Sequence, residues 1–509
     1  MPETHREVER EYEASDNATM PALGALPGVT RARRAGRHRL DAVYFDTADL
    51  ALARAGVSLR RRSGGDDDGW HLKLPADGDE RIEVRVPLGR SVRTVPKALR
   101  SAVREYRRDE PLSPVAAVIS ERVVTELLDG RRVLASVSDD RVLATSSPPD
   151  AEPVEQRWRE WEVELVEGEP SLLDAAGPVL DAAGGRRAVR ASKLTRALGD
   201  RLPPPSEQPA RLTAGAAASS VIGERLRAQV GEFRHEAVRV RVGLPGGVHR
   251  ARVALRRLRS ALATFRPFVD PEVTEPLRDE LRWIAGLLGE ARDAEVLRTR
   301  HDRLLADEPN ELVRGPVRRR LDRHLDASGH DALTAVREAM DSERYLALLA
   351  ALDRLVEETA WTPAADQQAR DVLPQRVRHD QKRVLRAVEH AAASTDTAER
   401  DLLLHEARKA AKRSRYAAET LEPLYGKDAR RFVSRLKQVQ TTLGDHHDSV
   451  VMRDLLVTLA DAAEQAGESS FSYGRLHAHA EADTHHSVQA FDEAWHQANA
   501  NKRQRWLRT

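Results

Sequence analysis

The sequence predicts an α+β protein with two domains: an antiparallel β tunnel or barrel, followed by an all-α pair of four-helix bundles with an internal two-fold repeat. Residues 1–199 contain short segments in which apolar and charged residues alternate, as in strands. A proline-rich stretch at 200–213 separates them from residues 214–509, which show helical periodicity. A basic pattern then occurs twice, once in residues 214–360 and once in residues 361–509.

The first 199 residues contain segments with the two-residue period of a β-strand. Each has one apolar and one charged face. The charged face suits either a solvated outer surface or the interior of a barrel. The segments are EVEREYE, DAVYFDT, VSLRRR, WHLKLP, RIEVRVP, RVLASVS and EWEVELVE.

The proline cluster in DRLPPPSEQPARLTAG cannot continue regular structure, so this stretch is predicted to be a linker. Beyond it, the spacing of apolar residues predicts a series of amphipathic helices. Their ranges are 214–242, 247–267, 272–307, 312–326, 331–357, 364–392, 399–421, 427–465 and 472–501.

Composition limits the possible functions. Lys and Arg number 82 against 81 Asp and Glu, so any polyanion site requires local clustering rather than bulk charge. The absence of cysteine excludes disulfides and thiolate zinc sites. No apolar run reaches membrane-spanning length and the N-terminus lacks a signal-peptide core, so we expect a cytoplasmic protein without a membrane partner.

Two segments of the helical part, VHRARVALRRLRS and LHEARKAAKRSRY, carry basic residues at the same spacing. Steps of three, four and three residues place each set on one face of a helix; we call these sets the basic strips. Like charges on a strip repel one another, and either solvent or a polyanion relieves the repulsion. The duplication favours the polyanion. The strips are His249, Arg252, Arg256 and Arg259, and His405, Arg408, Lys412 and Arg415.

Each strip is followed by an L-G-x-x-x-D motif, with Gly289 and Asp293 in the first copy and Gly444 and Asp448 in the second. Glycine inside a helix costs ~1 kcal/mol relative to alanine, and a close helix crossing is the favoured reason for it. The aspartates are predicted to be intrahelical partners, with a salt bridge to the strip as the alternative. Further cations correspond between the copies: Arg257 with Arg413, and Arg282 with Lys437.

His446 and His447 precede the second aspartate. Adjacent helical residues point about 100° apart, which disfavours a metal ion shared by the two histidines.

The charged faces of the strands could form a site for a metal and phosphates. Carboxylates bind hard divalent cations, and Arg and Lys bind phosphate oxygens. Cross-strand salt bridges on an outer face explain the pattern equally well. The alternating residues are Glu7 and Glu9, Arg60 and Arg62, Lys73, Arg81, Glu83 and Arg85, and Glu160, Glu162 and Glu164.

Both halves resemble known families. The first 200 residues resemble a CYTH domain of the triphosphate tunnel metalloenzyme superfamily. That resemblance rests on Glu7-x-Glu9, VYFDTADLALARAGVSLRRR, Lys73-Leu-Pro, EWEVEL and Ala191-Ser192-Lys193-Leu194. Residues from about 214 onward resemble a CHAD domain, the conserved-histidine α-helical domain, through the two basic strips and the L-G-x-x-x-D helices.

The resemblance implies an eight-stranded tunnel that binds triphosphate with Mg²⁺ or Mn²⁺, and helical bundles that bind inorganic polyphosphate and localise to polyphosphate granules. It assigns metal binding and catalysis to Glu7, Glu9, Glu162 and Glu164. It assigns phosphate binding in the tunnel to Arg60, Arg62, Lys73, Arg85 and Lys193. The two strips, extended by Arg257, Arg282, Arg413 and Lys437, are then the polyphosphate site.

One position departs from the CYTH pattern Glu-x-Glu-x-Lys, because Glu11 stands where the lysine is expected. A carboxylate there repels a triphosphate or offers a further metal ligand. Two hypotheses follow: a polyphosphate-binding protein with a degenerate tunnel, and an active metal-dependent triphosphatase with a tethering domain. Nucleic-acid binding is a third, disfavoured because aromatic residues are only 4% of the chain and base stacking needs them.

Overall fold

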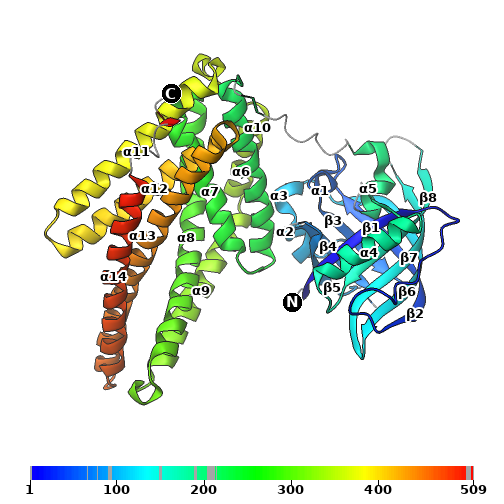
Figure 1. Cartoon of the computed structure of the whole chain (residues 1–509), viewed down its shortest axis with the longest axis horizontal. Coiled ribbons are helices and arrows are strands. Elements are labelled where there is room, and N and C mark those ends of the chain that lie inside the picture. Colours follow the sequence, from blue (N-terminus) through cyan, green and yellow to red (C-terminus); the bar gives the residue numbers. More distant parts are fainter. Residues whose placement is uncertain are drawn as a thin grey trace. The chain divides into compact units, whose positions relative to one another are not determined.

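The computed structural model describes residues 3–65, 67–76, 78–89, 94–147, 152–188, 192–202, 212–213, 215–499 and 506–507. The chain divides into two compact units, Met1–Glu207 and Gln208–Thr509, which we call the barrel unit and the helical unit (Figure 1). Most of the predicted linker, residues 203–211, and Ala191 of the CYTH-like motif lie outside the described residues.

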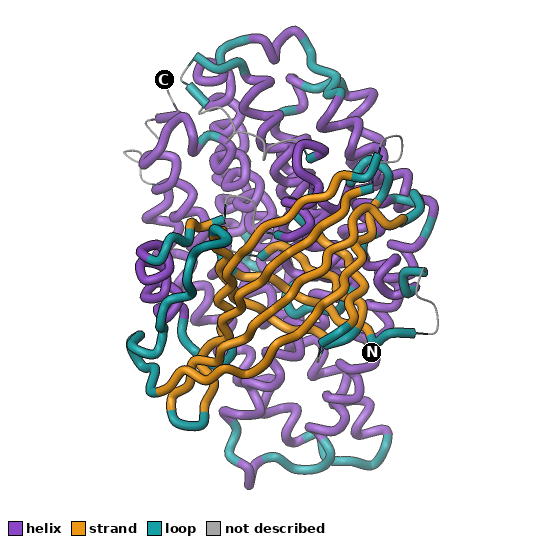
Figure 2. Tube along the Cα trace, turned by 90° about the vertical axis from the view of Figure 1, so that its right-hand side faces the viewer, coloured by secondary structure: helices purple, strands orange, loops and turns teal. Residues whose placement is uncertain are grey.

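The barrel unit is built on a closed antiparallel sheet, as the sequence predicted (Figure 2). The strand order is β5-β4-β3-β2-β6-β7-β8-β1, and β1 also pairs with β5, which closes the ring. The short β9 adds to β1 outside the ring. The strands are β1 Glu3–Ala14, β2 Arg31–Asp46, β3 Ser58–Ser63, β4 Gly69–Pro75, β5 Glu80–Val86, β6 Ser113–Asp129, β7 Arg132–Ser146, β8 Val154–Leu165 and β9 Arg186–Arg187.

Alternation along the strands sends carboxylates into the barrel and apolar side chains outward. On β1, Tyr12 packs with Trp161 of β8 in an apolar cluster covered by helix α4 (Pro170–Ala182). The intervening residues face the interior, where Glu9 lies opposite Glu164 and Glu11 opposite Glu162. The remaining short helices are α1 Ala51–Arg54, α2 Lys97–Ala102, α3 Arg104–Arg107 and α5 Lys193–Leu198.

Strand β6 is not among the segments expected from the sequence. Its text, SPVAAVISERVVTELLD, contains runs of adjacent apolar residues instead of strict alternation. The strand forms because both its edges are paired, with β2 on one side and β7 on the other.

The helical unit consists of long antiparallel helices. They are α6 Ala218–Arg241, α7 Gly247–Thr264, α8 Pro271–Asp307, α9 Val317–Asp341, α10 Glu343–Glu357, α11 Ala369–Ala393, α12 Thr397–Thr420, α13 Glu422–Gln465 and α14 Phe471–Ala498. The two strip-bearing helices, α7 and α12, pack against each other, and so do α8 and α13, which carry the L-G-x-x-x-D motifs. Small buried residues on the strip helices, among them Ala251, Ala407 and Ala411, suit this close packing.

The predicted break between 326 and 331 is wrong. Helix α9 continues through Ser328 and Gly329, because Ala332, Val336 and Met340 beyond them are buried in the core of the unit. The chain breaks at Ser342, whose side chain accepts a hydrogen bond from the backbone N–H of Tyr345 and so caps α10.

None of the helices in the described residues combines the length and the hydropathy that crossing a membrane requires.

Candidate functional site

Four cations from the two basic strips lie together where α7 meets α12. We call Arg252, Arg256, Arg408 and Lys412 the central cations. Burial lowers the pKa of Lys412 to about 6, with further contributions from Arg408 on the same helix and Arg256 on α7. Burial also lowers the pKa of Arg408; Asp448 opposes this shift, and Arg256 and Arg252 of α7 add to it. The strips therefore face a common region rather than opposite sides of the unit.

The central cations are only partly neutralised by the protein. Arg252 forms an ion pair with Asp293 at 2.9 Å, and Arg408 with Asp448 at 3.7 Å. Arg256 donates from Nε to the hydroxyl of Tyr416 at 2.9 Å. In the described part of the chain, Arg256 and Lys412 form no ion pair with a carboxylate. This leaves an excess of positive charge at the centre.

The L-G-x-x-x-D motifs position the outer two of these arginines. A Cβ on Gly444 would lie 3.0 Å from Nη2 of Arg408, and one on Gly289 would lie 3.6 Å from Nη2 of Arg252. Each glycine thus leaves space for a guanidinium group, which then reaches the aspartate one helical turn further on. The favoured interpretation of the aspartates as intrahelical partners is wrong, because each pairs with an arginine of a strip. The glycines lie where α7 packs against α8 and α12 against α13, which agrees with the close helix crossing favoured from the sequence.

Each strip histidine lies beside a residue of the following long helix. The imidazole rings of His405 and His447 have centroids 4.2 Å apart at an angle of 45°. Burial and the neighbouring Arg292 lower the pKa of His249. Arg292 and His447 precede the motif aspartates in the two copies, so they are equivalent positions. From the sequence, His447 was considered only as a metal ligand and neither residue was placed in the polyphosphate site, although the two copies of the repeat, 155 residues apart here, align them directly.

His446 faces elsewhere. Its ring contacts Asp401 at 3.1 Å, whereas the ring of His447 contacts that of His405.

Several predicted strip residues are occupied by contacts inside the protein. Glu419 forms ion pairs with Arg257 at 3.1 Å, Arg415 at 3.0 Å and Arg225 at 2.8 Å. Arg413 pairs with Asp380 at 3.0 Å. These cations support the packing of α7 and α12. Because their charges are already paired with carboxylates, they are less available to a bound anion than Arg256 and Lys412.

The remaining predicted cations of the polyphosphate site, Arg259, Arg282 and Lys437, lie in different surroundings. Burial lowers the pKa of Arg259, together with Arg282 and Arg278 on α8. Arg282 pairs with Asp279 on an exposed surface, where such pairs contribute little. Lys437 is exposed.

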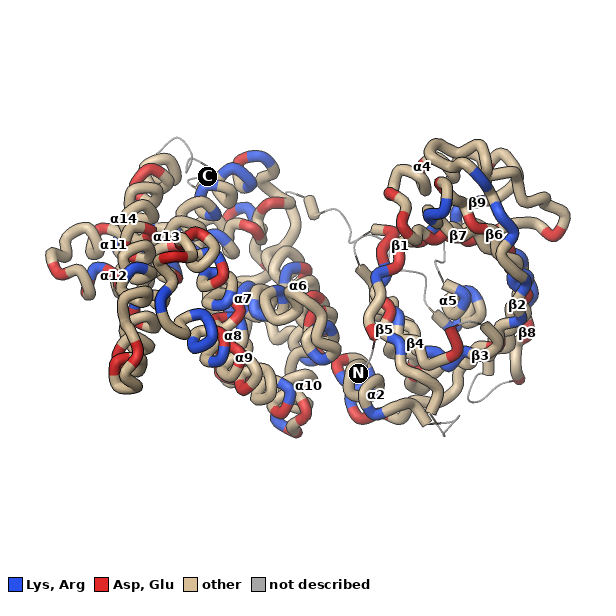
Figure 3. Tube along the Cα trace, turned by 90° about the horizontal axis from the view of Figure 1, so that it is seen from below, with Lys and Arg blue, Asp and Glu red and all other residues tan. Residues whose placement is uncertain are grey.

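In the barrel unit, all nine residues that the CYTH resemblance selects line one cavity of about 230 Å³. Figure 3 shows the ring of strands end-on, and Lys193 of α5 also lines the cavity. The nine residues are Glu7, Glu9, Arg60, Arg62, Lys73, Arg85, Glu162, Glu164 and Lys193.

Ion pairs link the opposite charges within the cavity. Lys73 contacts Glu7 at 2.7 Å and Glu9 at 3.3 Å, and Arg85 contacts Glu7 at 3.2 Å. Burial raises the pKa of Glu9, and repulsion from other carboxylates adds to it. Burial likewise raises the pKa of Glu11 to about 8 and that of Glu164 to about 7. Burial along the strand pair β1–β8 therefore disfavours the charged forms of these three carboxylates.

This donor set suits a hard divalent cation. Burial disfavours the charged forms of the facing carboxylates Glu9 and Glu164, and a bound cation would stabilise those forms. Oxygen ligands are what Mg²⁺ and Mn²⁺ prefer. Among the described residues, however, the group of three carboxylates whose oxygen atoms lie within 4.8 Å of one another consists of Asp140, Glu160 and Glu162, so it contains one of the four expected ligands.

The cation within reach of that group is Lys193, whose Nζ lies 3.0 Å from Asp140 and 3.4 Å from Glu162. Arg122 of β6 adds contacts to Asp140 and Glu162 at 2.7 and 2.8 Å. Burial by itself would raise the pKa of Glu162, but the charges of Arg122 and Lys193 outweigh it and hold this pKa well below its usual range. Arg122 was missed because β6 was missed.

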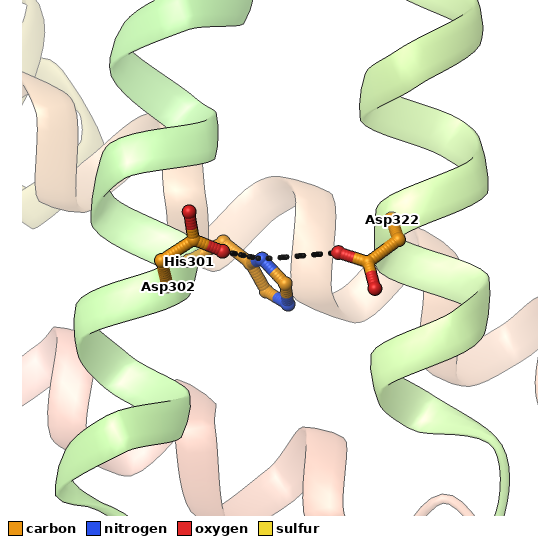
Figure 4. Close-up of side chains that lie close together, drawn as sticks. All are labelled: His301, Asp302 and Asp322. Carbon is orange, nitrogen blue, oxygen red and sulfur yellow. Dashed lines mark hydrogen bonds and ion pairs between the residues drawn. The ribbon is translucent and has the colours of Figure 1, made fainter.

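A third cluster lies between α8 and α9 (Figure 4). Nδ1 of the buried His301 lies 3.1 Å from Asp302 and 3.9 Å from Asp322. Asp322 also accepts a hydrogen bond from Arg298 at 2.6 Å. The cluster links the two helices and its carboxylates are already engaged.

Comparison with known proteins agrees with this architecture. A CYTH domain model matches residues 5–198 and a CHAD domain model matches residues 224–457. The chain is 38% identical over 497 residues to the uncharacterized protein Rv2226 of Mycobacterium tuberculosis, a match that covers 94% of this chain and 93% of that protein. The protein belongs to the CYTH-CHAD family, in which a CYTH domain is followed by a CHAD domain.

Two solved structures are similar to part of this chain. The CHAD domain from the plant Ricinus communis is 29% identical with a TM-score of 0.44, covering 57% of this chain and 95% of that one. PptA from Streptomyces chartreusis is 25% identical with a TM-score of 0.43, covering 55% of this chain and 100% of that one.

Proposed function

We propose that the helical unit binds inorganic polyphosphate through the central cations. The observation that carries this proposal is the meeting of the two basic strips at α7 and α12, where Arg256 and Lys412 have no carboxylate partner among the described residues. Burial and neighbouring cations lower the pKa values of Arg408 and Lys412, so their charged forms are disfavoured in the free protein, and a chain of phosphates relieves the repulsion. Guanidinium groups bind phosphate oxygens through two parallel hydrogen bonds, and lysine adds a point charge.

The test is a binding titration with long-chain polyphosphate. Replacing Arg252, Arg256, Arg408 and Lys412 by Ala is expected to weaken binding at least about 100-fold at low salt, because each charge-assisted hydrogen bond contributes roughly 1.5–3 kcal/mol. Circular dichroism should show unchanged helix content. Unchanged affinity would reject the site, and lost helicity would show that these residues are structural.

A competition experiment separates polyphosphate from nucleic acid. Both interactions weaken with salt, so the two ligands must be compared at one salt concentration. We expect polyphosphate to displace a bound oligonucleotide, because the central site is lined by cations and offers little aromatic surface for base stacking. Preference for the oligonucleotide would overturn the proposal.

A second function is favoured by the cavity of the barrel unit, which is lined by both carboxylates and cations. Glu7, Glu9, Glu162 and Glu164 would hold Mg²⁺ or Mn²⁺, which supplies Lewis-acid activation and charge neutralisation in phosphoanhydride hydrolysis. Arg60, Arg62, Lys73, Arg85 and Lys193 would hold the phosphate oxygens of triphosphate. Whether this cavity hydrolyses triphosphate is tested by phosphate release with either metal, and no release with both removes the enzymatic function.

A further inference from the structure

The two copies of the basic strip end in chemically different pairs. In the second copy, His405 of α12 lies against His447 of α13 with ring centroids 4.2 Å apart. Nδ1 of His405 is shielded from solvent and has no hydrogen-bond partner in the described structure. In the first copy, His249 of α7 lies near Arg292 of α8, which is charged at every physiological pH and forms an ion pair with Glu295 at 2.9 Å.

Charged groups from four helices surround the histidine pair. On α12 they are Arg408, Lys409 and Lys412; on α13, Asp448; on α8, Asp293; and on α7, Arg252 and Arg256 act through Lys412. Cations outnumber carboxylates in this set. Protonating either imidazole therefore adds a charge to an environment that already repels it, unless an anion is present.

We propose that His405 and His447 form a phosphate contact that engages only when they are protonated, whereas the Arg292 end of the same site binds phosphate at any pH. This proposal rests on the proposed function of the helical unit. A phosphate chain at the central cations would place acceptor oxygens within reach of the imidazole N–H groups, and protonated histidine donates from both ring nitrogens. The ligand is thus held at one end under alkaline conditions and at both ends under mildly acidic conditions.

The pKa shifts of His405 and His447 set the pH range in which binding takes up protons. Burial, His447 and nearby cations lower the pKa of His405 to about 4. Burial and Arg408 also lower the pKa of His447. A bound polyanion raises both pKa values towards about 6.5 or above. Binding therefore takes up protons between about pH 4 and 6.5. For each proton taken up, the affinity rises about tenfold when the pH falls by one unit.

The internal repeat provides a reciprocal experiment. His447→Arg makes the second copy resemble the first, and Arg292→His makes the first resemble the second. The dissociation constant for long-chain polyphosphate is measured for the full-length protein at pH 5.5, 6.5 and 7.5 at constant ionic strength. We expect the affinity of the wild-type protein to rise at least tenfold from pH 6.5 to 5.5. In His447→Arg this rise should be about tenfold smaller. In Arg292→His the affinity should depend on pH more steeply than in wild type.

The outcomes separate the two proposals. If His447→Arg keeps the wild-type pH dependence, the histidine contact is rejected while polyphosphate binding stands. If no form of the protein binds polyphosphate at any of these pH values, the proposed function itself fails. A second measurement guards against a variant that misfolds: in wild-type protein with ¹³C-labelled histidine, polyphosphate should raise the pKa of His405 by at least two units. No change would refute the contact.

Discussion

Lys412 should make polyphosphate binding depend on pH above neutrality, in a range where histidines no longer titrate. Its pKa is about 6 in the free protein because burial and neighbouring arginines disfavour the ammonium. Phosphates restore the charged form. Below pH 6, Lys412 is already charged, and binding takes up no proton at this residue. Above pH 6, binding takes up one proton, so the dissociation constant rises about tenfold with each pH unit, up to the pKa of Lys412 in the complex.

The size of the effect follows from that value. At pH 8 only about 1% of the free protein carries a charged Lys412, which weakens binding about 100-fold relative to a permanently charged residue. Lys412→Arg is the matched variant, because arginine stays charged throughout this range. It should bind at pH 8 at least as tightly as wild type and lose most of the pH dependence between pH 7 and 9.

Isothermal titration calorimetry in two buffers of different protonation enthalpy counts the protons directly. At pH 8 we expect wild type to take up about one proton and Lys412→Arg to take up close to none. Equal proton uptake by the two proteins, or an affinity of wild type that is flat above pH 7, would refute the reasoning.

Three further changes probe other parts of the protein. Gly444→Ala puts a Cβ 3.0 Å from Nη2 of Arg408 and should weaken polyphosphate binding several-fold in the same titration, while Gly289→Ala, with 3.6 Å available, should change it less; equal effects would argue against the role given to the glycines. Lys412→Met should raise the thermal midpoint of the free protein by a few degrees, because it removes the free-energy cost of burying the lysine ammonium or deprotonating it on folding, and a lowered midpoint would contradict that. Glu11→Lys should tighten metal-free triphosphate binding, measured by calorimetry, because it replaces a carboxylate in the cavity by a cation, and weaker binding would contradict this.

The sequence was sufficient where a property depends on local spacing. The strands and the strip-bearing helices follow from periods of 2 and 3.6 residues, whereas the closed sheet and its charged interior were implied by the resemblance to a CYTH domain. Ion pairs between residues on different helices could not be predicted from the sequence. Nothing near Arg257 indicates that Glu419 on another helix neutralises it, or that Asp380 does the same for Arg413. Arg256, the neighbour of Arg257, faces the central site instead.

Elements that depend on neighbours on both sides were also missed. Strand β6 is stabilised by pairing with β2 and β7. Because this strand was not expected from the sequence, its residue Arg122 was not identified as part of the cavity lining. Arg292 and His447 were within reach of the sequence, since the repeat offset aligns them next to the motif aspartates. Only the structure shows that each lies beside a strip histidine.

The adjacent residues Arg256 and Arg257 allow the most direct test of polyphosphate binding by the central cations. Both are strip arginines on α7, but Arg256 faces the central site, whereas Arg257 is paired with Glu419. The measurement is the dissociation constant for long-chain polyphosphate of Arg256→Ala and Arg257→Ala at about 0.1 M salt. We predict that Arg256→Ala weakens binding at least about tenfold and that Arg257→Ala stays within about twofold of wild type. Equal losses, or a larger loss for Arg257→Ala, would show that the ligand is not held where α7 meets α12.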